Sequence, residues 1–278
     1  MNFKAPTQSW LRRFSLFTVA AAILVAVVRC LNLFFFFDSH IGYYQSNAVL
    51  PVVEVVLLIL AGILLAAVTL FLLCRMPVEY AEATPASVKG VAFLATVLSI
   101  ISAIQLISVK SASPLPRFLS VLSIIAAAYF LLNGWSNPAI LPRFLTGFGG
   151  ILALVVSLAL SYFDITVQMN APDKIFFQLA CLSFMLFTTE ELRFTVGAPR
   201  KGLYFFSVGC ATLFGVIATI PTLIGIVAGV LEVPSWAPCY GLLIANLIYA
   251  VARMLSLVWK EQASSEEIPQ ESEDQNEQ

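Results

Sequence analysis

Long apolar runs constrain this chain more than any other feature. The first run, Phe14–Phe37, holds a single charge, Arg29. A bilayer core is ~30 Å thick and an α-helix rises ~1.5 Å per residue, so this run is long enough to cross a membrane. It exceeds the ~7–15 apolar residues of a cleaved signal peptide and ends without a small-residue cleavage motif. We therefore expect it to remain as a membrane span.

The composition extends this argument to the whole chain. Of its 278 residues, 60% are hydrophobic and only 11% are charged, whereas soluble chains average about 25% charged residues. The alternating segments of ~10 residues that mark a transmembrane β-barrel are absent. The sequence predicts an all-α, polytopic transmembrane helical bundle with about eight spans in one integral membrane domain, residues 1–260. The expected spans cover residues 14–37, 49–74, 90–109, 118–133, 144–162, 175–192, 203–231 and 237–258.

The basic residues orient these spans. Segments on one side of the predicted membrane hold eleven of them: Lys4, Arg12, Arg13, Arg75, Lys89, Arg143, Arg193, Arg200, Lys201, Arg253 and Lys260. Segments on the other side hold three: Lys110, Arg117 and Lys174. Cytoplasmic loops carry the excess of basic residues, so the bias predicts that both termini lie in the cytoplasm.

The segments outside the spans are short or polar. No loop is long enough to form a domain, so any function is expected in the bundle, at its two mouths or in a partner. The C-terminal segment, residues 261–278, contains seven acidic residues and no basic one. A segment of this kind cannot bury enough apolar surface to fold, so we expect a disordered acidic cytoplasmic tail.

Arg29 and Glu54 form the most informative pair. Arg29 precedes the predicted outer surface by nine residues and Glu54 follows it by seven, which places the two charges ~13 Å and ~10 Å deep on neighbouring spans. An unpaired charge near the bilayer centre costs ~2.5–3.5 kcal/mol, so pairing is expected. One interpretation is a gate, a proton site or a substrate contact in which Arg29 binds an anion in a cavity. The other is a structural pair, or an Arg29 side chain that extends to the interface.

The seventh span carries the second candidate. Pro221 lies inside it between Thr219 and Thr222, and a proline removes one helical hydrogen bond. Helices interrupted in this way line binding sites in transporters, where threonine hydroxyls can satisfy the freed carbonyl. The spacing of Gly225 and Gly229 is also typical of close helix packing, which is the alternative interpretation.

Other polar residues in the spans are weaker candidates. Gln105 and Asn246 could contact a substrate or form hydrogen bonds between helices. Near the inner face, either Glu190 or Glu191 could pair with Arg253 and join the ends of the sixth and eighth spans. Charges exposed at the level of the lipid headgroups are the alternative.

The sequence lacks the short motifs that mark common enzymes, metal sites and nucleotide-binding proteins. The sequence contains no GxSxG, HExxH, P-loop, CxxC or GxGxxG signature and no basic stripe suited to nucleic acid. The five cysteines are isolated. We therefore predict no enzyme activity, no metal site, no cofactor and no nucleic-acid partner.

Two functions fit these observations. The first is a permease or exporter of a small or amphipathic solute, with Arg29 and Glu54 as polar contacts and Pro221 as a flexing point. The second is a non-transporting accessory, sensor or scaffold subunit that binds another membrane protein or a second copy of itself. Compact loops without an outer glycosylation sequon favour a bacterial plasma membrane as the location. A cavity that reaches Arg29 or Glu54 would favour transport, and an apolar lateral groove would favour a partner.

Overall fold

The computed structural model describes residues 9–38, 42–45, 48–69, 86–109, 113–135, 139–197 and 200–266. Within these residues it contains eight helices that are long and apolar enough to cross a membrane. This confirms the predicted all-α, polytopic helical bundle. The helices are α1 (Ser9–Phe35), α2 (Leu50–Ala67), α3 (Ala86–Ser108), α4 (Leu115–Gly134), α5 (Ile140–Phe163), α6 (Pro172–Thr195), α7 (Lys201–Val227) and α8 (Tyr240–Glu266).

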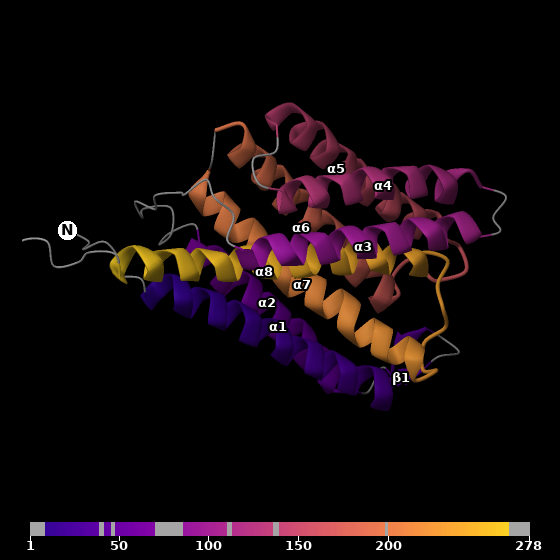
Figure 1. The fold of residues 1–278 in the computed structure, drawn as a ribbon. Coiled ribbons are helices and arrows are strands. Elements are labelled where there is room, and N and C mark those ends of the chain that lie inside the picture. Colours follow the sequence, from indigo (N-terminus) through magenta and orange to yellow (C-terminus); the bar gives the residue numbers. More distant parts are fainter. Residues whose placement is uncertain are drawn as a thin grey trace, which may run out of the picture.

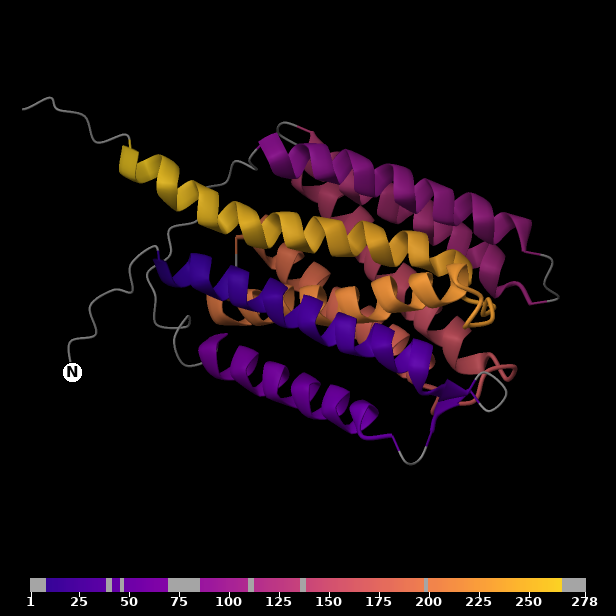
Figure 2. The ribbon, with the colours of Figure 1, turned by 90° about the horizontal axis from the view of Figure 1, so that it is seen from below.

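The helices run roughly along one long axis of the molecule (Figure 1). Helices α1 and α2 form one flank and α3, α4 and α5 the other, with α6, α7 and α8 between them (Figure 2). Helix α1 begins and α8 ends at the same end of the bundle, here called the terminal end. The opposite end carries a small antiparallel hairpin of β1 (Phe37–Asp38) and β2 (Tyr43–Tyr44) and is called the hairpin end.

Helix α2 is the most loosely packed of the eight. Only 17% of its apolar window is buried, against 67% for α7. It lies at the edge of the bundle next to α1 (Figure 2). Its inner-facing contact is with α7, where a Cβ on Gly209 would lie 2.5 Å from Leu65 Cδ1. The exposed apolar faces of α2 are those expected of a helix that contacts lipid.

The observed ends of α2 and α8 differ from the predicted span boundaries. Helix α2 closes with a wider turn at Val68 and Thr69, and residues 70–85, which include the predicted end of the second span, lie outside the described residues. Helix α8 starts after a short 3₁₀ turn, η3 (Ala237–Cys239), and continues through Glu266. Residues 261–266 are therefore helical, and the rest of the predicted tail lies outside the described residues.

The end of α7 corrects the prediction for Gly225 and Gly229. Gly229 lies beyond the helix with φ of 72°, and a Cβ added there would meet nothing within 4 Å. The backbone N–H groups of Gly229 and Val230 donate to the carbonyls of Ile226 and Gly225, which is the pattern of a glycine C-cap. A Cβ on Gly225 would meet Leu231 of the following turn, not another helix. The two glycines end α7 and do not form a helix-packing motif.

Close helix packing occurs elsewhere, at glycines that the sequence did not single out. A Cβ on Gly241 of α8 would lie 3.0 Å from the backbone oxygen of Leu98 in α3. A Cβ on Gly149 of α5 would lie 2.3 Å from Ile125 Cγ2 in α4. Small residues at these crossings let the helix backbones approach each other closely.

Candidate functional site

Arg29 is the centre of a buried polar cluster near the hairpin end. Its side chain is fully buried in α1, six residues before the helix ends at Phe35. Nη1 lies 3.4 Å from Glu54 Oε1 on α2, and Nη2 contacts Asp173 Oδ1 at the start of α6. The guanidinium carbon also lies 4.0 Å from the centre of the Phe176 ring. The charge of Arg29 is therefore neutralised from two helices and covered by an aromatic face.

Glu54 has a second partner on α1 besides Arg29. The Asn32 side chain, which is fully buried, donates from Nδ2 to Glu54 Oε2. Because Asn32 follows Arg29 by three residues, both project from the same face of α1. These contacts fasten the hairpin end of α2, the most loosely packed helix, to α1.

Asp173 connects this cluster to α6 and α7. It is the second residue of α6, after Pro172, where an acidic side chain suits the positive end of the helix. Besides Arg29, it accepts a hydrogen bond of 3.3 Å from Thr222 Oγ1, directly after Pro221 in α7. Its side chain is 14% exposed, so the cluster approaches the surface here. We call Arg29, Asn32, Glu54, Asp173 and Thr222 the hairpin-end cluster.

Tyr44 of β2 lies over the same charges. Burial raises the pKa of its hydroxyl, and the carboxylates of Glu54 and Asp173 raise it further, although Arg29 acts in the opposite direction. Tyr44 is therefore neutral in this environment and available to form hydrogen bonds. The hairpin thus places a polar group beside the ion pairs.

A second cluster lies near the terminal end of the bundle. Arg253 Nε of α8 lies 2.8 Å from Glu191 Oε1 of α6, and the Tyr204 hydroxyl of α7 donates to the same oxygen. Glu191 and Tyr204 are fully buried, and Glu191 lies four residues before the end of α6. The Tyr249 hydroxyl, also buried, interacts electrostatically with Glu191 and Arg253. We call Glu191, Tyr204, Tyr249 and Arg253 the terminal-end cluster.

The structure separates the two glutamates that the sequence left as alternatives. Glu191 forms the contact with Arg253. Glu190 instead lies 3.5 Å from Arg193, one turn along the same helix. Of these two glutamates, only Glu191 joins α6 to α8.

Two other predicted contacts lie away from both clusters. Gln105 is exposed on α3, so it faces away from the bundle, and this corrects its prediction as a substrate contact. Asn246 is buried but donates to the Leu242 carbonyl of its own helix. The hydroxyls beside Pro221 were expected to bond the backbone carbonyl that the proline frees. Instead, Thr219 donates to the carbonyl of Gly215 and Thr222 donates to the carboxylate of Asp173. Pro221 itself lies inside a continuous α7.

Between the clusters, the buried hydroxyls of the bundle bond mainly to their own helices. Each of five described side chains donates to the carbonyl four residues earlier: Thr18, Thr96, Ser99, Ser157 and Thr212. Small apolar residues fill the surrounding space. The middle of the described bundle is therefore apolar, with polar groups gathered at its two ends.

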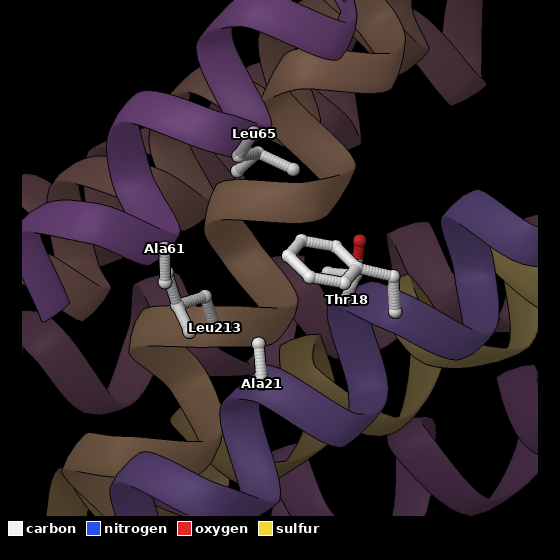
Figure 3. A pocket seen from close by; sticks show the side chains of 6 residues that line it. Thr18, Ala21, Ala61, Leu65 and Leu213 are labelled. Carbon is white, nitrogen blue, oxygen red and sulfur yellow. The ribbon is translucent and has the colours of Figure 1, made fainter. Parts of the chain in front are cut away.

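A shallow lateral hollow, with room for about one water molecule, lies between α1, α2 and α7 (Figure 3). Its lining is almost entirely apolar and comprises Phe17, Thr18, Ala21, Ala61, Leu65 and Leu213. It does not reach Arg29 or Glu54. Ala61 follows Glu54 by seven residues, so the hollow begins ~10 Å along α2 from the hairpin-end cluster.

Polar contacts also join the loops at the hairpin end. Lys174, which is 1% exposed, donates from Nζ to the carbonyl of Asp164 at 2.7 Å. The Asp164 carboxylate accepts hydrogen bonds from Ser235, in the loop before α8, and from Thr166. The loop between α5 and α6 is thereby attached to the loop between α7 and α8.

Sequence reasoning missed the most important partner of Arg29. Asp173 lay outside the expected span 175–192, although its place after Pro172 is a signal for the first turn of a helix. Lys174 likewise lay outside the expected span. Among the described residues, no group of three or more histidine, cysteine, aspartate or glutamate side chains is placed to hold a metal ion.

No known protein family, curated protein or solved structure matches this chain. The eight apolar helices are those of a multi-pass membrane protein. The two polar clusters and the hollow are the structural features that bear on a more specific function.

Proposed function

We propose that this protein is a permease or exporter of a small or amphipathic solute in a bacterial plasma membrane, with both termini in the cytoplasm. In this proposal the hairpin end faces outward and the terminal end faces inward. The observation that supports it most is the placement of buried ion pairs near both ends of an otherwise apolar bundle. Charged residues inside membrane helices are rare and costly, and they commonly mark a transport pathway.

The clusters act as two closures. The hairpin-end cluster joins α1, α2 and α6, and the terminal-end cluster joins α6, α7 and α8. Helix α6 contributes to both, through Asp173 and Glu191. Opening one closure while the other holds would expose the bundle interior to one side at a time, as transport by alternating access requires. Thr222 and Pro221 connect α7 to the first closure, so α7 is the expected flexing element.

Access at single cysteines tests this proposal. On a background without native cysteines, Val25→Cys, one turn below Arg29, is probed from outside with a water-soluble thiol reagent. We expect slow labelling that becomes faster when Glu54→Gln weakens the closure. Glu232→Cys, in the exposed loop between α7 and α8, is the control for reagent quality. An unlabelled Val25→Cys in both backgrounds would mean a dry bundle and would contradict transport.

The second candidate function is a non-transporting subunit that binds another membrane helix. It is supported by the lateral hollow, which is apolar and does not reach either charged cluster, so by the criterion set from the sequence this feature favours a partner and not transport. The accessibility experiment separates the two candidates, because a subunit of this kind has no reason to admit water to Val25.

A further inference from the structure

The surroundings of Arg29 have the chemistry of a cation-binding cage. Two carboxylates, those of Glu54 and Asp173, approach the guanidinium, and the Phe176 ring covers one of its faces. Tyr44 and Tyr240 also interact with it electrostatically. Carboxylates combined with aromatic faces are the usual recognition elements for organic cations.

Among the described residues, the cage contains more acidic than basic side chains. Arg29 faces two acidic side chains, and neighbouring Lys174 is not a second cation of the cage, because its Nζ donates to backbone carbonyls in the loop between α5 and α6. The carboxylate of Asp164 is engaged by Ser235 and Thr166 and lies outside the cage. Within the part of the chain that the structure describes, the cage therefore has one acidic side chain in excess over the single guanidinium.

A buried polar atom in the cage also has unused capacity. Asn32 Oδ1 is buried and has no hydrogen-bond partner among the described residues. Asn32 is fixed in the cage by its bond to Glu54. Its oxygen can accept a hydrogen bond from an ammonium group.

We propose that the cage binds the ammonium head of a cationic amphiphile, and that the Arg29 side chain occupies it as a tethered competitor in the closed state. The proposal names the substrate class for the permease function and rests on that function only for the transport step. Exposed apolar side chains of α1 and α2 close to the cage in sequence, such as Phe35 and Val52, face the lipid that would hold the alkyl chain. Binding then exchanges one cation for another, so the formal charge of the cage is unchanged.

Removal of the competitor is the decisive test. Arg29→Ala leaves both carboxylates without their cation, so we expect a lower melting temperature for the purified variant in lipid nanodiscs. Millimolar octylammonium should restore the melting temperature of Arg29→Ala, and equal octanoate should not. We also expect Arg29→Ala to bind octylammonium about tenfold more tightly than the unaltered protein. Glu54→Gln, added to Arg29→Ala, should remove most of this gain.

Controls keep the result unambiguous. Glu232→Gln removes an exposed carboxylate at the same end of the bundle and should leave octylammonium binding unchanged. If Arg29→Ala does not fold, the unaltered protein and Glu54→Gln are compared directly, and weaker octylammonium binding by Glu54→Gln is expected. If the unaltered protein binds octanoate more tightly than octylammonium, and Arg29→Ala loses this preference, the proposal is overturned, because Arg29 is then an anion site. Equilibrium binding is measured without flux, so it can succeed even where the accessibility experiment rejects transport.

Discussion

At the scale of single residues, the shared neutralisation of Arg29 is the main feature. Its guanidinium contacts Glu54 and Asp173 from different helices, so each carboxylate can compensate for loss of the other. Leaving a buried charge without any partner costs about 3–5 kcal/mol. The stability of the fold therefore depends on having one acidic partner, whereas closure of the hairpin end depends on the Glu54 contact to α2.

The first prediction follows from this redundancy. We expect Glu54→Gln and Asp173→Asn to lower stability only modestly, and the double variant to lose about 3 kcal/mol more than the sum of the two, because Arg29 is then stranded. Thermal and denaturant unfolding of the purified variants measures this. Additive effects of the two substitutions would show that Arg29 does not share its partners.

The second prediction concerns Asp164. Burial opposes ionisation, but hydrogen bonds from Ser235 and Thr166 outweigh it and lower the pKa of this carboxyl. A lowered pKa stabilises the folded protein above the ordinary aspartate pKa of about 4, and the stabilisation is lost as pH falls through the lowered value. We expect Asp164→Asn to reduce the drop in melting temperature between pH 6 and pH 3. An unchanged drop would exclude Asp164 as a source of acid sensitivity.

At the scale of helices, the tightness of packing differs sharply across the bundle. Helix α8 approaches α3 so closely at Gly241 that an added Cβ would press on the backbone oxygen of Leu98. Helix α2, in contrast, has open space at Gly62, where a Cβ would meet nothing within 4 Å. The helix that forms one wall of the hollow is thus the one with most freedom to shift.

The third prediction compares these two glycines. Gly241→Ala should destabilise the protein by about 1–3 kcal/mol, because a backbone atom cannot move aside as a side chain can. Gly62→Ala is the matched control and should be neutral or stabilising by up to about 1 kcal/mol, since alanine favours the helix. Melting temperatures of both variants in the same lipid provide the comparison. Equal losses would contradict the difference in packing.

At the scale of the whole molecule, the sequence predicted the spans well because hydrophobic length alone identifies them. It also placed Arg29 and Glu54 at similar depth by counting residues from a common surface. It could not predict which way each helix faces, because residues toward lipid and residues toward the core are both apolar. That is why Gln105 was expected inside, although it is exposed, and why the burial of Lys174 was missed.

The central claim is that the two clusters close opposite ends of one pathway in alternation. Paired reporters test it most directly: Val25→Cys near the hairpin-end cluster and Phe187→Cys, one turn from Glu191, each labelled from its own side. Arg253→Gln weakens the terminal-end closure, so we expect faster labelling of Phe187→Cys and slower labelling of Val25→Cys. Faster labelling at both reporters, or a change at Phe187→Cys alone, would contradict alternating closure.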